Sequence, residues 1–257
     1  MLFQKLRQID DWYQIYNDPE LTGMCLANYN AIRNVFDDIK VIKDRESLLK
    51  DRIKQYLERM GNPEEYSLHE LKEKYFLLDW IACNIIFDRP IKTKQLFITR
   101  KYSTQETLIL NMLSRVLKTY FASARRNDFS GAHDYYDLWV FDEFHDPDSV
   151  VGATEQGTTF ANTILKVLDG QETRLDLKYS RVFTKRNNVP IVMIANNIPA
   201  SAEKPGPMQA RLLRLPFTTN IKNIKEERVI ATLWECIERR IKQSPYVLEN
   251  QRNVSIQ

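Results

Sequence analysis

The sequence predicts an α/β domain built on a parallel sheet with helices on both faces, preceded by a smaller all-helical region. Three short apolar runs support the sheet, at residues 95–99, 137–141 and 190–195. Strands that are apolar throughout, instead of alternating with polar residues, are typical of parallel sheets covered on both faces. Stretches with helical spacing lie between the runs, as crossovers between parallel strands require.

The composition is that of an ordinary globular chain of 257 residues, 43% hydrophobic and 28% charged, which argues against disorder. A net charge of +3 means that any nucleic-acid footprint must be local. The cysteines Cys25, Cys83 and Cys236 are isolated, which excludes a disulfide framework and fits a reducing compartment. We expect no membrane-spanning helix and no signal peptide, hence an intracellular protein, cytoplasmic or nuclear, or organellar if encoded there.

Residues 1–88 are expected to be helical and are a candidate region for oligomer contacts, with plain packing as the alternative. The Gly61-Asn62-Pro63 sequence is a helix stop signal. Ser67 then forms a capping box with Glu70, three residues later, and opens a helix that runs to about Phe87.

The α/β domain is expected to span residues 89–243, with a flexible polar tail at 244–257. After the first strand, six residues fall on one helical face: Ile109, Met112, Leu113, Val116, Leu117 and Tyr120. A second amphipathic helix near the C-terminus is marked by Ile230, Leu233, Trp234, Ile237 and Ile241.

Polar residues follow each predicted strand, where ligands bind in parallel sheets. The loop 100–107 follows the first strand, Asp142-Glu143 ends the second, and Asn196 follows the third. An Asp-Glu pair at a strand end suits Mg²⁺ binding and activation of an attacking water. The alternatives are a solvated acidic strand end and an asparagine that caps backbone groups.

The segment from Tyr135 to Phe144 resembles the Walker B region of one P-loop NTPase family. That family is the AAA+-like superfamily 3 helicase domain of the Rep replication-initiator proteins of circular single-stranded DNA viruses and plasmids. Four further segments resemble its motifs in the same order, namely the approach to the phosphate loop, the intermediate motif, motif C and the arginine-finger segment: residues 80–98, 168–185, 190–196 and 211–217.

This resemblance covers about residues 65–220 and implies a set of site residues. The equivalents of the catalytic residues are Asp142, Glu143, Asn196, Arg211 and Arg214. The equivalents of the Mg²⁺ ligands are Thr107 and Asp142. For the two arginines, the alternative is a surface or inter-subunit ion pair.

The phosphate loop departs from the family pattern GxxxxGK[ST]. The corresponding stretch is Arg100-Lys101-Tyr102-Ser103-Thr104-Gln105-Glu106-Thr107, of which only Thr107 matches. Arg100 and Gln105 stand at the glycine positions, and Glu106 stands at the lysine position. A degenerate nucleotide-binding loop is therefore expected.

The physical cost of these replacements is large. Glycine lets backbone N–H groups wrap a phosphate, and another residue in that conformation costs about 1 kcal/mol or more. A carboxylate at the lysine position replaces attraction of about 4 kcal/mol with repulsion of similar size. We therefore expect no ATP hydrolysis and no cofactor, with Mg-ATP bound only if the loop works in an unusual way. Asp142 and Glu143 are then expected to hold Mg²⁺ weakly or to pair with Arg100 or Lys101.

Basic residues are concentrated in two segments. Residues 89–127 contain nine basic residues and one acid, and residues 174–186 contain five basic residues and one acid. In the resembling helicases the intermediate motif forms a hairpin that contacts single-stranded DNA. The candidate nucleic-acid-binding residues are Arg174, Lys178, Tyr179, Lys185 and Arg186, with Phe183 as a second stacking candidate. The alternative is a solvated basic face.

The histidines argue against a nicking activity. Rep proteins usually add an endonuclease with a His-x-His metal pair and a catalytic tyrosine. Here the histidines are His69, His133 and His145, with no pair at ligand spacing. We expect neither a histidine metal site nor strand nicking.

Three functional hypotheses follow. The first is a Rep-derived helicase fold that has lost ATP hydrolysis and serves as a nucleic-acid-binding or scaffolding subunit. The second is an active helicase with an unusual phosphate loop. The third is a purely structural component of a nucleoprotein or organellar complex. The expected partners are single-stranded DNA or RNA and further subunits, either identical copies or those of a larger complex, with no membrane.

Overall fold

The computed structural model describes residues 2–9, 12–29, 32–33, 35–36, 48–60, 72–87, 89–100, 104–123, 129, 131–144, 155–175, 183–203, 205–219 and 223–243. The chain forms two compact units, residues 1–52 and 53–257. The structure thus places the division near residue 52, whereas the sequence suggested a boundary near residue 88. The residues after 88 and the helix before them share one unit because that helix packs on the C-terminal helix.

The first unit is a small helical cluster. It contains α1 (Leu2–Arg7), the 3₁₀ helix η1 (Trp12–Asn17) and α2 (Pro19–Ala27). Its core consists of Leu6, Trp12, Ile15, Leu21, Cys25, Ile32 and Phe36. Asp18 caps α2 by accepting hydrogen bonds from the Glu20 and Leu21 amides, which satisfies donors that the first turn of a helix leaves unpaired.

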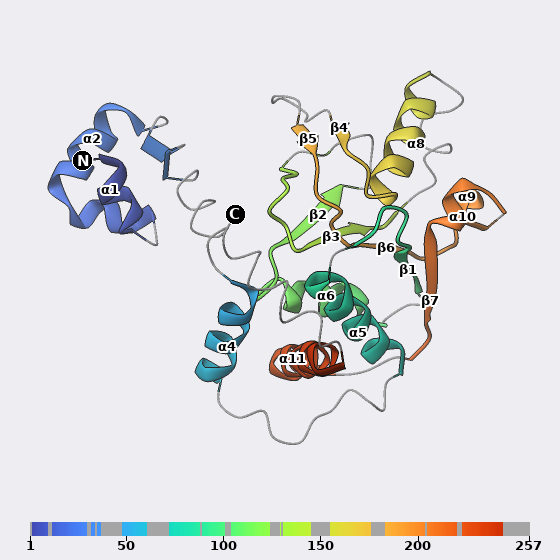
Figure 1. Ribbon diagram of the computed structural model, residues 1–257. Helices are drawn as coiled ribbons and strands as arrows, with labels where there is room; N and C mark the ends of the chain where they lie inside the picture. Colours follow the sequence, from blue (N-terminus) through green and yellow to red (C-terminus); the bar gives the residue numbers. More distant parts are fainter. Residues whose placement is uncertain are drawn as a thin grey trace. The chain divides into compact units, whose positions relative to one another are not determined.

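The second unit is built on a five-stranded, entirely parallel sheet, which confirms the predicted fold class (Figure 1). Its strand order is β2-β3-β6-β1-β7. The strands are β1 (Gln95–Arg100), β2 (Thr119–Ser123), β3 (Leu138–Asp142), β6 (Ile191–Ala195) and β7 (Leu212–Phe217). A separate antiparallel hairpin is formed by β4 (Thr173–Leu175) and β5 (Phe183–Lys185), in the intermediate segment where the resemblance implies one.

The remaining described helices lie from residue 49 onward. They are α4 (Leu49–Met60), α5 (Lys72–Ile86), α6 (Glu106–Leu113), α8 (Glu155–Leu168), α9 (Ala200–Glu203), α10 (Pro207–Ala210) and α11 (Glu226–Gln243). Figure 1 shows α5, α6 and α11 gathered on one side of the sheet and α8 on the other. Among the described helices, none combines the length and apolarity needed to cross a bilayer.

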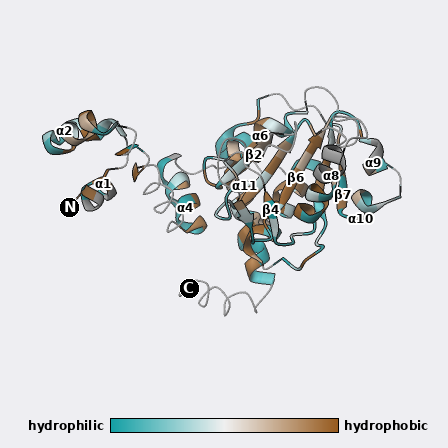
Figure 2. Cartoon of the chain, turned by 90° about the horizontal axis from the view of Figure 1, so that it is seen from above, coloured by the Kyte–Doolittle hydropathy of each residue, from teal (hydrophilic) through white to brown (hydrophobic). Residues whose placement is uncertain are grey.

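The core of the second unit follows the alternation of strand side chains. Phe97, Trp139, Phe141 and Met193 point to the face where Val167 of α8 packs. Their neighbours along the strands are equally buried on the opposite face. Figure 2 shows hydrophobic residues along the strands of this sheet. Continuous apolar strands were the main signal for this sheet, and the structure explains the signal by burial on both faces.

The helix predicted to extend as far as Tyr120 is shorter than expected. The observed helix α6 ends at Leu113, and Tyr120 lies in strand β2 beside β3. Val116 and Leu117 are buried in the connection between them. An apolar spacing compatible with a helix therefore ran across a helix, a turn and a strand, because residues of all three are buried, with Tyr120 on the face of the sheet that α8 covers.

Several expectations concern residues outside the described ones. The capping box of Ser67 and Glu70 and the tail at 244–257 both fall there. The helix that the capping box was expected to open is seen from Lys72 as α5. The C-terminal amphipathic helix is observed as α11.

The parallel arrangement brings three strand ends together. Strand β1 ends at Arg100, β3 ends at Asp142, and Asn196 follows the last residue of β6. Because β6 pairs with both β1 and β3 in parallel, these residues lie at the same edge of the sheet. We call this edge the carboxyl edge and the opposite one the amino edge.

Candidate functional site: an arginine in the phosphate-loop position

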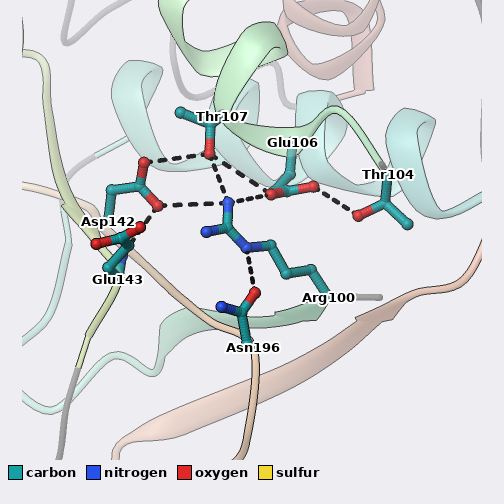
Figure 3. A network of polar contacts seen from close by, with 7 residues as sticks. All are labelled: Arg100, Thr104, Glu106, Thr107, Asp142, Glu143 and Asn196. Carbon is teal, nitrogen blue, oxygen red and sulfur yellow. Dashed lines mark hydrogen bonds and ion pairs between the residues drawn. The ribbon is translucent and has the colours of Figure 1, made fainter. Parts of the chain in front are cut away.

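The Arg100 guanidinium lies at the centre of a polar network at the carboxyl edge (Figure 3). Its Nε donates to Asn196 Oδ1 at 2.8 Å. Its Nη1 donates to Glu106 Oε1 at 2.5 Å and to Thr107 Oγ1 at 2.9 Å. The same nitrogen is 3.6 Å from Asp142 Oδ1. One cation therefore bridges β1, the start of α6, β3 and the end of β6.

The Glu106 side chain is buried, with only 4% of its surface exposed. Its second oxygen accepts a hydrogen bond from Thr104 Oγ1 at 2.6 Å. Burial by itself raises the pKa of this carboxyl. The hydrogen bonds from Thr104 and Arg100 lower the pKa by more than burial raises it, so it lies below its ordinary value. Glu106 is therefore an ionised group at neutral pH and the principal counter-charge of Arg100.

Thr107 and Asp142 approach each other as the predicted metal ligands would. Thr107 Oγ1 donates to Asp142 Oδ2 at 3.2 Å. The arginine contacts both side chains and occupies the space beside them. Asp142 is thus paired with Arg100, one of the two partners expected for it. Lys101 and Ser103 lie outside the described residues.

Two residues of the site have left-handed backbone conformations without being glycine. Gln105 has φ +61° and stands at the position of the second glycine of the phosphate-loop pattern. Glu143 has φ +52°, and its amide donates to Asp142 Oδ1 at 2.9 Å. Each conformation costs about 1 kcal/mol or more for a residue with a Cβ. The backbone at Gln105 therefore has a conformation that favours glycine, although the residue carries a side chain.

Mg-ATP does not fit this arrangement of residues. Mg²⁺ requires oxygen ligands at about 2.0–2.1 Å in octahedral geometry, and the oxygens of Thr107 and Asp142 face a guanidinium instead. A triphosphate would meet the ionised Glu106 where a lysine normally neutralises it. The residues at the carboxyl edge satisfy one another without a ligand.

The two arginines expected in the finger segment lie away from this network. Arg211 precedes β7 at the amino edge, where its Nη2 contacts Asp169 Oδ2 at 2.7 Å and its Nη1 donates to the Pro207 carbonyl. Arg214 lies within β7 and donates to the Ala202 carbonyl. Within one chain, both therefore make local contacts, and neither reaches Asp142.

Lys185 requires a correction. The sequence suggested that it contacts nucleic acid, but its side chain is fully buried. Its ammonium donates to the Asn187 carbonyl and lies 5.8 Å from the centroid of the Trp139 ring. Burial lowers its pKa to about 8. A side chain without exposed surface does not contact a nucleic acid.

The remaining candidates for nucleic-acid contact divide into two groups. Arg174 and Arg186 are exposed at the hairpin. Lys178 and Tyr179 lie outside the described residues. The aromatic residues just before β3 are not among the candidates predicted from the sequence. Their signal there is the close spacing of ring residues in 133–136. Among the described residues, no cluster of three or more potential ligands could hold a metal ion, and His133 stacks on an aromatic ring instead.

Comparisons with protein-family models and with curated proteins give no match. The chain is similar to solved structures of JCV helicase. One is 16% identical with a TM-score of 0.46 and covers 87% of this chain and 69% of the helicase chain. An inhibitor-bound form is 15% identical with a TM-score of 0.46 and covers 95% and 77%. The C-terminal region of NrS-1 is 13% identical with a TM-score of 0.40 and covers 74% and 43%. At these identities and scores the similarities carry no argument about the site.

Proposed function

We propose that this chain is a Rep-derived, superfamily 3 helicase-like protein that has lost ATP hydrolysis and serves as a nucleic-acid-binding or scaffolding subunit of a larger assembly. The observation that supports the loss is the position of Arg100. Its guanidinium contacts Glu106, Thr107, Asp142 and Asn196, the groups that a nucleotide and its metal would engage.

A metal ion and the Arg100 guanidinium would compete for the same space and the same negative charges. A metal ion that bridged Thr107 and Asp142 would have to displace the guanidinium, since both hold it within 3.6 Å. If the arginine stayed, two cations about 4 Å apart would repel each other, by roughly 4 kcal/mol per unit charge at an intermediate dielectric. Displacement would in turn leave the buried Glu106 without its counter-charge, which is costly.

The Arg100 network connects the strand ends in the absence of nucleotide. In an active P-loop NTPase, the phosphates and the metal connect the phosphate loop, the Walker B strand and the sensor strand. Here Arg100 connects the same elements from within the chain. The domain can therefore hold one conformation permanently, which suits a scaffold better than a motor.

The exposed residues Arg174 and Arg186 of the hairpin supply positive charge that does not depend on the phosphate loop. Electrostatic binding to phosphates requires no nucleotide hydrolysis. We accordingly propose single-stranded DNA or RNA as a partner, and assembly with further subunits as the setting.

One observation favours an alternative function. Thr107 and Asp142 remain within 3.2 Å of each other, as a magnesium site would require. An active helicase would then need Arg100 to swing out when Mg-ATP arrives.

A titration with a fluorescent ATP analogue and Mg²⁺ separates the two. We expect no saturable binding by the native chain up to millimolar concentrations. In the triple variant Arg100→Gly, Gln105→Gly, Glu106→Lys, which restores the pattern at three positions, we expect measurable binding. Lys54→Gln serves as the control, because it removes an exposed basic residue of α4 outside the network. Micromolar binding by the native chain would refute the proposal.

A further inference from the structure

A stack of aromatic rings lies just before the amino ends of β3 and β6. The rings of His133 and Tyr135 are stacked, with centroids 5.1 Å apart and planes at 21°. Tyr135 and Tyr136 follow at 4.7 Å. Phe183 of the hairpin meets His133 edge-on at 5.8 Å. Four rings from two separate segments thus form one continuous group, which we call the amino-edge stack.

The stack is the outer layer of the core. Its four members are each partly exposed, whereas Tyr120 and Trp139 beneath them are buried. Tyr136 links the layers, because its ring lies 5.4 Å from that of Tyr120 and its hydroxyl donates to the Gly131 carbonyl at 3.1 Å. The rings are therefore held in place before any partner arrives, which reduces the entropy cost of binding.

Positive charge is fixed beside the rings. Asp134, between His133 and Tyr135 in the chain, accepts hydrogen bonds from the backbone amides of Arg186 and Asn187 at 3.0 and 3.1 Å. These bonds hold the backbone of the exposed Arg186 next to the segment that carries the stack, and they satisfy the aspartate with backbone donors. The segment 173–187 contains five basic residues and one acid.

The chemistry of this surface fits one partner better than others. Half-exposed aromatic rings next to an arginine favour a ligand that has flat π-faces and regularly spaced negative charges. Single-stranded nucleic acid has both, and stacking of bases on aromatic side chains tolerates any sequence. The five basic residues and one acid of segment 173–187 suit a polyanion better than a protein surface of mixed charge.

We propose that the amino-edge stack is a base-stacking platform for single-stranded nucleic acid, with Arg186 contacting a phosphate. The inference rests on the proposed nucleic-acid binding and adds a place and a mode to it. The platform is separate from the Arg100 network, which lies at the opposite edge of the sheet.

The test is fluorescence anisotropy with a fluorescein-labelled 20-mer of deoxythymidine, repeated with oligouridine, at several salt concentrations. Tyr135→Leu is expected to weaken binding about five- to hundredfold, the effect of losing a stacked base, while leaving the slope against salt unchanged. Tyr135→Phe is expected to bind like the native chain, because it keeps the ring. Arg186→Gln is expected to lower the salt slope by about one.

Tyr16→Leu is the matched control, since Tyr16 is 53% exposed in the first unit. If Tyr135→Leu proves to be unfolded by circular dichroism, His133→Leu provides the same test. Equal binding by folded stack variants and the native chain would overturn the platform but leave nucleic-acid binding elsewhere intact. If the native chain does not bind, both this inference and the nucleic-acid part of the proposed function are wrong. The nucleotide titration remains a separate test of the lost ATPase.

Discussion

The two edges of the sheet surround their cations with opposite kinds of group. At the carboxyl edge, Arg100 is surrounded by the carboxylates of Glu106 and Asp142. At the amino edge, Lys185 lies against a ring and a carbonyl, and Arg89 donates to the side-chain oxygens of Asn84 and Gln95. Burial lowers the pKa of Lys185 to about 8 and that of Arg89 to about 10.

This difference shows how the position of counter-charges decides what a site can do. A cation neutralised inside the chain leaves no charge for a ligand to compensate, which supports our proposal that the carboxyl edge does not bind Mg-ATP. At the amino edge the contacts of Lys185 and Arg89 are to neutral groups, with Asp134 as an electrostatic neighbour of Lys185, and we propose that this edge receives an anionic partner. We therefore expect substitutions at the carboxyl edge to change mainly stability, and substitutions at the amino edge to change the binding that we propose.

The largest expected effect comes from breaking the carboxyl-edge network. Arg100→Ala leaves Glu106 as a buried carboxylate without its cation, and should lower the free energy of unfolding by about 3–5 kcal/mol. Urea unfolding followed by circular dichroism measures the change. Arg214→Ala is the control, because Arg214 is exposed and donates only to a backbone carbonyl in the described structure. Equal losses of unfolding free energy in the two variants would show that Arg100 stabilises the fold no more than an exposed arginine does.

A pH series on Lys185→Met sharpens the comparison from the other edge. The pKa of Lys185 is about 8 in the folded chain against 10.5 for the unfolded one, so burying the charge costs roughly 3 kcal/mol at neutral pH. Between these pH values the unfolded chain binds more protons, so the stability of the native chain should rise with pH relative to the variant. A difference in unfolding free energy that does not change between pH 7 and pH 10 would contradict this account.

The Arg211–Asp169 pair gives a smaller effect. Asp169 is 4% exposed, so Arg211→Ala leaves a buried acceptor with a lost partner and should cost about 2 kcal/mol. The loss should be the same at low and high protein concentration, because the contact lies within one chain. A loss that appears only when subunits assemble would indicate a role across an interface instead.

The smallest effect concerns backbone strain at Gln105, just before α6. Gln105→Gly should stabilise the chain by about 0.5–1 kcal/mol, because φ +61° costs glycine nothing. Its Oε1 is also buried with no hydrogen-bond partner among the described residues. Gln105→Ala is the control and should bring no gain from φ. Destabilisation by the glycine would show that the side chain contributes more than the strain costs.

The sequence predicted the elements whose signals are local. Three apolar runs identified β1, β3 and β6, and the residues after them marked the carboxyl edge. Strand β2 was missed because Tyr120 also fits a helical spacing, and the choice between helix and strand depends on pairing with β3. Local signals therefore predicted the three central strands of the sheet but not its outer strand β2.

The candidate site was predictable in its members but not in its geometry. The departure of residues 100–107 from the phosphate-loop pattern is a sequence observation. That Arg100 reaches Asn196, 96 residues further along the chain, follows only from the convergence of β1 and β6. The burial of Lys185 could not be predicted either. A basic residue in a hairpin is expected to be exposed, and its packing near the Trp139 ring is known only from the structure.

The most direct test of the account is a crystal structure from crystals grown with Mg²⁺ and a non-hydrolysable ATP analogue at millimolar concentration. The account predicts that the Arg100 guanidinium still joins Glu106, Asp142 and Asn196, with no triphosphate between them. A triphosphate bound along residues 100–107, with Arg100 turned away and a metal ion on Thr107 and Asp142, would contradict it.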